Sequence, residues 1–363
     1  MTTRTSIPQM EPSFDAAEPR AIADYMANGG WLTEHTKTAE FEESLKDYIG
    51  AQHVVILPNG TLSLTVALLA LGIGRGDEVI VPDMTMIASA NSVLLAGAGC
   101  VLADVEPTTL CLDRTACERA ITPKTKAIML VSLNGRSPDM TEWAGFAKRR
   151  GLALIEDAAQ SLGSRCQGRH LGTFGDVGSF SFSAPKIITT GQGGCLVTDR
   201  ADLAHRIRLI KDFGRERAGV DKHISLGFNF KFTDLQAVVG LEQMKKLPWR
   251  ANRKKDIFAL YRSLLADLPE VRFLETDLTQ TSPWFVDIYV ARRDELAAVL
   301  RAAGIGSRPV YPPVHTQAPY HSAGRYPIST QASHTGLWLP SGSNLTDDEV
   351  SKICRAIRSF YGK

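Results

Sequence analysis

Residues 178–194 read Gly178-Ser179-Phe180-Ser181-Phe182-Ser183-Ala184-Pro185-Lys186-Ile187-Ile188-Thr189-Thr190-Gly191-Gln192-Gly193-Gly194. In this stretch a strand-like run ends in small and hydroxyl residues, Lys186 follows, and a glycine-rich turn leads into another strand-like run. Apolar neighbours at the end of a strand partly remove water from Lys186, which lowers its pKa from about 10.4 and frees the amine for reaction with carbonyl compounds. Because most lysines are surface charges, the interpretation depends on the sequence around this stretch.

Short runs rich in β-branched residues alternate with longer helical stretches through the first two thirds of the chain. The predicted strands are residues 53–57, 78–82, 100–104, 126–131, 152–156, 177–182 and 194–198. The predicted helices between them include residues 62–71, 87–96 and 140–149. Continuous apolar strands separated by helices are typical of an α/β fold, in which a mostly parallel seven-stranded sheet carries helices on both faces.

The pattern changes after about Leu247, and a chain of 363 residues is long enough for two domains. We predict a large domain over residues 1–247 and a small C-terminal α+β domain over residues 248–363. The elements expected in the small domain are a helix at 249–268, a strand at 287–291, a helix at 294–303, a Pro-rich loop at 309–313 and a helix from 347. The basic run Arg250, Arg253, Lys254 and Lys255 is interpreted as a solvated helix face, with a binding patch as the alternative.

Composition narrows the functional class. The chain is 44% hydrophobic and 22% charged, as in ordinary globular proteins, and contains no apolar run near the roughly 20 residues that span a bilayer. Since the first 20 residues lack an apolar signal core, we expect a cytoplasmic protein without a membrane partner. The net charge of +2 argues against nucleic acid as the main partner. Six scattered cysteines without a CxxC pair predict reduced thiols and no metal site.

An acidic residue follows one of the predicted buried strands. Asp157 comes directly after strand 152–156, and ligands of open α/β sheets bind beyond the carboxyl ends of the strands. A carboxylate there can pair with a protonated pyridine nitrogen and keep the ring an electron sink. The alternative is a helix N-cap, for which Asp is well suited.

A third feature follows strand 53–57, where Pro58-Asn59-Gly60-Thr61 opens an apolar helix. Free N–H groups at a helix start, the small Gly60 and the hydroxyl of Thr61 together make an anion site, although an ordinary helix cap is the alternative. The three features fit one ligand, pyridoxal 5′-phosphate. Its phosphate would lie at Gly60 and Thr61, its pyridine nitrogen at Asp157 and its aldehyde carbon at Lys186.

The order of these features along the chain and the residues that surround them resemble the DegT/DnrJ/EryC1/StrS family of sugar aminotransferases, which have the aspartate-aminotransferase-like fold (fold type I). The resemblance covers nearly the whole chain, and its most specific stretches are residues 71–82, 121–128, 155–160 and 180–194. It implies that Lys186 is the catalytic Schiff-base lysine. It also implies a homodimer with shared active sites, because Asn229 matches a residue that reaches the cofactor phosphate of the neighbouring subunit.

The remaining cofactor positions also come from the resemblance. Asp157 matches the partner of the pyridine nitrogen, and Gln160 matches the residue near the cofactor's phenolic oxygen. The phosphate-binding positions are Gly60, Thr61 and Ser181. Met86 stands where the family usually has an aromatic ring stacked on the cofactor.

Within the family, residues 307–316 and 188–191 are most similar to the GDP-perosamine synthases, which aminate GDP-4-keto-6-deoxy-mannose at C4. This similarity implies a nucleotide-linked keto sugar as amino acceptor and L-glutamate as donor, released as 2-oxoglutarate. Ser183, Arg308 and His315 are then expected near the sugar nucleotide. The alternative for the Pro-rich loop is a rigid connector.

Several positions depart from the family pattern. Besides Met86, the segment Ser132-Leu133-Asn134-Gly135 replaces His-Leu-Tyr-Gly, Ser183-Ala184-Pro185 replaces Phe-Gly-Asn, and Lys231-Phe232 replaces Arg-Met. Glutamine replaces a usual glutamate at Gln192 and Gln160. Three alternative functions therefore stay open. They are an aminocyclitol aminotransferase, a silent regulatory homologue, and a sugar dehydratase, whose class carries histidine at the position of Lys186.

Overall fold

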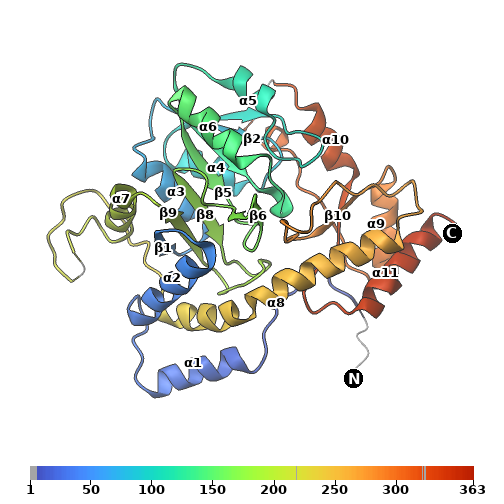
Figure 1. The fold of residues 1–363 in the computed structure, drawn as a ribbon, viewed down its shortest axis with the longest axis horizontal. Helices are drawn as coiled ribbons and strands as arrows, with labels where there is room; N and C mark the ends of the chain where they lie inside the picture. The colour runs from blue at the N-terminus through green and yellow to red at the C-terminus, as the bar shows by residue number, and fades with distance from the viewer. Residues whose placement is uncertain (1–5, 218, 321, 323) are drawn as a thin grey trace.

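The computed structural model describes residues 6–217, 219–320, 322 and 324–363, and within them a seven-stranded sheet forms the centre of the larger part of the molecule (Figure 1). The strands are β1 (His53–Leu57), β2 (Glu78–Pro82), β3 (Gly99–Ala103), β4 (Thr125–Val131), β5 (Ala153–Asp157), β8 (Val177–Ser181) and β9 (Gly194–Thr198). Their order is β1-β9-β8-β5-β4-β2-β3, and β9 runs antiparallel to both of its neighbours. The predicted fold class is confirmed, with strand ends within one residue of those expected.

Helices cover both faces of this sheet because each buried strand alternates its side chains between the faces. In β1, Val55 and Leu57 face a core shared with α3, α4 and α7, while Val54 and Ile56 face a core shared with α2 and α8. A third cluster packs α5 and α6 on β2, β4 and β5. The helix bounds are α1 (Ala17–Ala27), α2 (Thr36–Ile49), α3 (Gly60–Ala70), α4 (Ala88–Leu95), α5 (Arg114–Ala120), α6 (Met140–Arg150) and α7 (Ala201–Lys211).

The long helix α8 (Asp234–Leu264) joins the two parts of the molecule (Figure 1). Met244 and Leu247 pack in the core of the large sheet, whereas Ile257 and Phe258 pack in the C-terminal core. The helix therefore begins well before the predicted residue 249, and it runs through Pro248. Gly240 and Pro248 lower helix propensity, so packing on both cores stabilises the helix where local preference does not. The expected division between residues 247 and 248 lies inside this continuous helix.

The C-terminal part of the described chain contains a three-stranded antiparallel sheet in the order β10-β12-β11. Its elements are β10 (Val286–Tyr289), α9 (Arg293–Ala302), β11 (Arg308–Pro309), η2 (Val314–Thr316), α10 (Pro327–Thr335), β12 (Gly336–Leu339) and α11 (Asp347–Phe360). The N-terminal segment joins this part, because Ile7 pairs with Ile305. The hairpin of β6 (Arg165–Cys166) and β7 (Arg169–His170) and the turn η1 (Leu133–Gly135) lie in the large part. No helix among the described residues is long and apolar enough to cross a membrane.

The basic run on α8 departs from the prediction. Arg250 and Lys254 are each only 2% exposed, so the interpretation of the run as a solvated face is wrong for these two residues. Arg253 is half-buried and pairs with Asp347 at the start of α11, 2.7 Å apart. The error arises because residues four apart share one helix face, and that face is turned inward between the two cores.

Candidate active site

Lys186 lies on the loop that follows β8, where its backbone N–H donates to the carbonyl of Ser183 at 2.9 Å. Its amine is 4.1 Å from the centroid of the Trp284 ring. Burial lowers the pKa of Lys186 to about 8, and the negative charge of Asp157 opposes this shift. Because the lowered pKa brings the neutral amine within reach of ordinary pH, the group is suited to react with a carbonyl or to accept a proton.

Asp157 is the last residue of β5 and is 5% exposed. Ser89, in the first turn of α4, donates its hydroxyl to Asp157 Oδ2 at 2.6 Å, and Thr85 lies 2.8 Å from the Ser89 oxygen. Burial raises the pKa of Asp157, while the hydrogen bond from Ser89 and the charge of Lys186 lower it. Asp157 Oδ1 accepts from the Ala159 N–H at 3.2 Å in a turn, and no helix begins there.

The start of α3 lies against the end of β8. A Cβ placed on Gly60 would be 3.0 Å from Ser181 Cβ and 3.3 Å from Ser181 Oγ. The side chain of Asn59 accepts from the Leu62 N–H at 2.9 Å, so the amides of Gly60 and Thr61 are the first of the helix. A hydroxyl beside the positive end of a helix dipole forms an anion site. Asn59 performs the helix capping, and the anion site at the amides of Gly60 and Thr61 stays a prediction.

These groups meet at one edge of the sheet. Asp157 on β5 is in register with Ser179 on β8, two residues before Ser181. The Ala158 N–H donates to the Ser179 carbonyl at 2.9 Å, and Ser183 Oγ is 3.4 Å from Ser181 Oγ. The carboxyl ends of β5 and β8 thus bring Asp157, Ser181 and Ser183 together, with Gly60 across from Ser181.

Two residues at this edge were missed by sequence reasoning. Trp284 comes from the segment before β10 and donates its indole N–H to the Pro185 carbonyl at 2.8 Å. Ser89 lies three residues after Met86, and its relevance appears only from the bond to Asp157. Neither Trp284 nor Ser89 belongs to a motif that the sequence alone would single out.

Gln160 and Met86 lie on the loops beside these residues. Gln160 is 6% exposed, and its Oε1 accepts from the Asn134 N–H at 2.8 Å. Asn134 has φ of 53°, which is the left-handed region that asparagine tolerates. The backbone carbonyl of Asn134 accepts from the backbone N–H of Trp284 at 3.3 Å. Met86 is 43% exposed just before α4, as expected for a residue that can face a ligand.

Arg308 and His315 lie on the C-terminal part. The Arg308 guanidinium is exposed on β11 and lies 5.4 Å from the Trp338 ring centroid. His315 Nδ1 is 2.7 Å from Asp83 Oδ2, and the His315 ring stacks on Tyr326 with centroids 4.7 Å apart. Asp83 directly follows β2, so His315 is held at the carboxyl edge of the same sheet as Asp157.

Asn229 lies elsewhere in the chain, on the exposed segment between α7 and α8 that projects from the body in Figure 1. It forms an isolated bridge with Asp212. The same segment exposes Ile224, Leu226 and Phe228, and Leu226 is 80% exposed. None of the other predicted site residues is on this segment.

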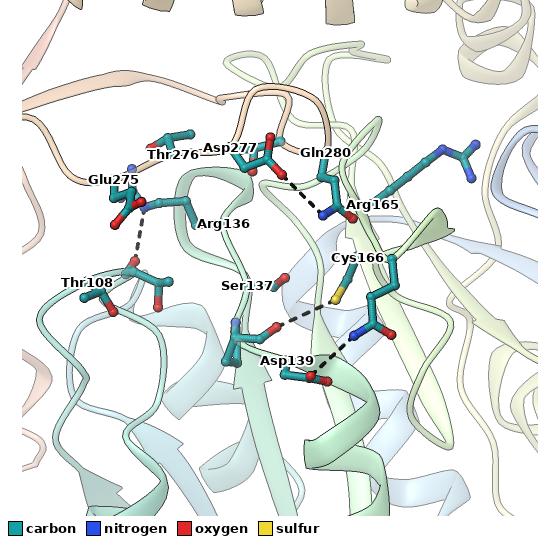
Figure 2. A pocket seen from close by; sticks show the side chains of 14 residues that line it. Thr108, Arg136, Ser137, Asp139, Arg165, Cys166, Glu275, Thr276, Asp277 and Gln280 are labelled. Carbon is teal, nitrogen blue, oxygen red and sulfur yellow. Dashed lines mark hydrogen bonds between the residues drawn. The ribbon is translucent and has the colours of Figure 1, made fainter.

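A separate pocket of about 380 Å³ opens between the loops after β3 and β4, the β6–β7 hairpin and residues 275–281 (Figure 2). Its polar side chains bind one another, as in the bond of 3.3 Å from Gln280 to Asp277. Arg136 at its wall donates to the buried Asp287 at 3.0 and 2.7 Å and to the Thr109 carbonyl at 3.1 Å. Since the pocket contains none of the predicted residues, the candidate active site lies at the carboxyl edge of the sheet.

The described residues contain no group of three or more His, Cys, Asp and Glu side chains that could hold a metal ion. All six cysteines of the chain are described, and each is a free thiol.

Comparison with known proteins identifies the family. The family model described as "DegT/DnrJ/EryC1/StrS aminotransferase family" matches residues 14–358. The GDP-perosamine synthase of Caulobacter vibrioides is 39% identical over 95% of this chain and 96% of its own, and that of Vibrio cholerae is 35% identical over 98% and 99%. The solved structure of the aminotransferase TlmJ from Streptoalloteichus hindustanus has a TM-score of 0.94 and 29% identity, over 98% of this chain and 99% of its own. This chain belongs to the DegT/DnrJ/EryC1/StrS aminotransferase family.

Proposed function

We propose that this enzyme uses pyridoxal 5′-phosphate to transfer the amino group of L-glutamate to a nucleotide-linked 4-keto-6-deoxy sugar, as a GDP-perosamine synthase does. The observation that carries the proposal is that three groups lie at one edge of the sheet. They are the desolvated amine of Lys186 after β8, the buried carboxylate of Asp157 at the end of β5, and the first turn of α3. The likeness to GDP-perosamine synthases over nearly the whole chain supports the substrate class. We place the reaction in the cytoplasm.

The residues present fit the cofactor. Gly60 leaves open the space beside Ser181 that a side chain would fill, and Thr61 adds a hydroxyl at the same helix start. Asp157 is a buried carboxylate that a cation would stabilise, since burial alone disfavours its charge. We propose that Gly60, Thr61 and Ser181 hold the phosphate, that Asp157 pairs with the ring nitrogen, and that Gln160 and Met86 line the ring.

The bound cofactor supplies an electron sink that makes the Cα proton of the amino acid acidic. In its neutral form the Lys186 amine accepts that proton as general base and can return it as general acid. The hydroxyl of Ser89 donates to Asp157 and favours the ionised carboxylate, which keeps a negative charge beneath the site. The Trp284 indole lies over Lys186 and excludes water from one side of the amine.

We propose that Ser183, Arg308 and His315 contact the sugar nucleotide. Arg308 is an exposed guanidinium, which suits a diphosphate. When His315 donates from Nδ1 to Asp83, Nε2 is left as an acceptor for a sugar hydroxyl. Ser183 Oγ is 3.4 Å from Ser181 Oγ, which supports a place for Ser183 beside the proposed phosphate position.

We also propose a homodimer in which Asn229 completes the phosphate site of the partner subunit. The exposed apolar side chains of Ile224, Leu226 and Phe228 beside Asn229 support this, because such a group on one projecting segment is typical of an interface. The retained Lys186 favours amino transfer over a dehydratase, since that class carries histidine at this position.

The test is Lys186→Ala in the purified enzyme. The wild-type protein is expected to show the visible absorption band of the bound cofactor and to lose that band on addition of L-glutamate. Lys186→Ala should lose both the band and all turnover, because the amine proposed to bind the cofactor and to move the proton is gone. A Lys186→Ala variant with full activity would refute the assignment.

The acceptor is identified with a panel of GDP-, UDP- and dTDP-linked keto sugars, read by release of 2-oxoglutarate and the mass of the product. A wild-type enzyme that aminates a cyclitol ketone but none of the nucleotide sugars would overturn the proposed substrate class.

A further inference from the structure

Three main-chain carbonyls around Lys186 accept hydrogen bonds from side chains of other elements. On one side of Lys186, the Pro185 carbonyl accepts from the Trp284 indole N–H at 2.8 Å. On the other side, the Ile187 carbonyl accepts from the Arg250 guanidinium at 3.1 Å. The carbonyl of Trp284 itself accepts from the Lys254 ammonium at 2.7 Å. The backbone is therefore held on both sides of Lys186. Trp284 is held through its indole N–H and through its own carbonyl.

The two cationic donors come from one face of α8. Arg250 and Lys254 are four residues apart and thus one turn apart, and each is 2% exposed. Arg250 also donates to the Ser13 carbonyl at 2.7 Å, and Lys254 also donates to the Ser341 carbonyl. We call Arg250, Lys254 and Trp284 the lysine clamp.

Burying two cations is costly, so their presence needs a reason. The desolvation of a buried charge is repaid only when its hydrogen bonds are well placed, and apolar replacements of buried charges are often neutral or stabilising. Burial and the neighbouring charge of Arg250 lower the pKa of Lys254 to about 7, which shows that the site disfavours the charge. Packing alone does not account for two cations at this point of α8.

We propose that Arg250 and Lys254 are positioning residues that fix Lys186 beneath the Trp284 ring, so that the amine stays aligned for proton transfer. The inference rests on the proposed role of Lys186. Its physical basis is that a misplacement of about 1 Å of a reacting group can cost about 10²-fold in rate. The rigid helix α8, anchored in both cores, transmits the positions of the two parts of the molecule to the lysine loop.

The experiment compares three clamp variants with one control on the same helix. Lys254→Met removes the ammonium, Arg250→Lys keeps the charge but shortens its reach, and Trp284→Phe keeps an aromatic ring but removes the indole N–H. The control is Lys255→Met, because Lys255 is the next residue on α8 and its amine reaches only the Thr279 carbonyl, at 3.4 Å, among its hydrogen bonds. For each variant we would measure kcat, both KM values, the urea midpoint of unfolding and the pH midpoint of the visible cofactor band.

We expect the clamp variants to lose about 10- to 100-fold in kcat with KM values within about threefold of wild type. The pH midpoint of the cofactor band should shift, because the surroundings of the Lys186 nitrogen change. Lys255→Met should match wild type in both. A purely structural role would lower the urea midpoint while leaving kcat and the band midpoint of the folded enzyme normal, and that result would overturn the inference.

If Lys254→Met fails to fold, Arg250→Lys and Trp284→Phe decide the question, since Arg250→Lys keeps a positive charge and Trp284→Phe keeps an aromatic ring. Normal kcat and a normal band midpoint in both of them would overturn the inference. The failure of the proposed function is distinguishable, because wild type and Lys255→Met would then either show no visible band or keep the band unchanged on addition of L-glutamate, without turnover.

Discussion

At the scale of single residues, the site depends on opposing effects on two buried charges. Burial disfavours the ammonium of Lys186 and the carboxylate of Asp157, and each charge partly offsets the effect on the other. The hydrogen bond from Ser89 lowers the pKa of Asp157, because a hydroxyl that donates to a carboxylate stabilises its ionised form. Thr85 lies within hydrogen-bond distance of Ser89 and orients it.

Replacement of Ser89 by alanine should weaken cofactor binding by about 10- to 100-fold, since a hydrogen bond to a charged group contributes about 1.5–3 kcal/mol. Without the donor, the pKa of Asp157 rises further. On acidification the carboxylate therefore becomes protonated at a higher pH than in the wild-type protein. The loss of affinity should therefore grow as pH falls. The measurement is cofactor Kd against pH by absorbance titration of the cofactor-free enzyme.

Ser92→Ala is the matched control, because the Ser92 hydroxyl donates only to the Ser89 carbonyl, at 2.7 Å, on the same buried face of α4. Equal Kd values for Ser89→Ala and wild type across the pH range would exclude the role given to Ser89.

At the scale of elements, the candidate site depends on the parallel direction of β1, β5 and β8, with Gly60 beyond the end of β1, and Asp157 and Ser181 as the last residues of β5 and β8. Parallel strands end at the same edge of a sheet, and α3 begins directly after β1 with its positive dipole end facing that edge. The close contact between α3 and β8 favours glycine at residue 60, since any larger side chain would press on Ser181.

Gly60→Val should raise the Kd for pyridoxal 5′-phosphate by about tenfold or more, because the added side chain would press on Ser181 and close the anion site. Binding of pyridoxal without its phosphate should change much less. Gly74→Ala serves as control, because a Cβ there meets only the Ala96 carbonyl at an ordinary 3.5 Å. An equal loss for both ligands in Gly60→Val would indicate general disruption rather than a phosphate site.

At the scale of the whole molecule, α8 ties the large sheet to the C-terminal part, and the segment between α7 and α8 projects outward with exposed apolar residues (Figure 1). Helix α8 positions the loop of Lys186 through Arg250 and Lys254 of the same subunit. The projecting segment is where the proposed partner subunit would contribute Asn229 to the phosphate site.

The shared site is tested by mixing two inactive variants. Lys186→Ala and Asn229→Ala should each lose turnover alone, whereas co-expressed subunits should recover up to about a quarter of wild-type activity. The recovery arises because half of the dimers would be mixed, and each mixed dimer would have one site with both intact residues. No recovery, together with normal dimerisation by light scattering, would contradict a site shared between subunits.

The strands, the helices between them and the position of Lys186, Asp157 and Gly60 relative to the strand ends were predictable, because hydrophobic periodicity and turn residues act over a few neighbours along the chain. The start of α8 was not, since Gly240 and Pro248 weaken the local helix signal and packing on two cores outweighs it. The Pro-rich loop could be predicted from its prolines, but the contact between His315 and Asp83 beside it could not.

From the amino-acid order alone followed the α/β class, the family and the chemical groups of the site, because each is written in patterns of adjacent residues. The tertiary structure alone decided that Arg250 and Lys254 are buried, that Trp284 covers Lys186 and that Ser89 binds Asp157. The bonds from Arg250 to Ile187, from Ser89 to Asp157 and from Trp284 to Pro185 join residues 63 to 99 positions apart. Such pairs meet only when whole elements pack, and no local pattern encodes which faces of those elements will touch.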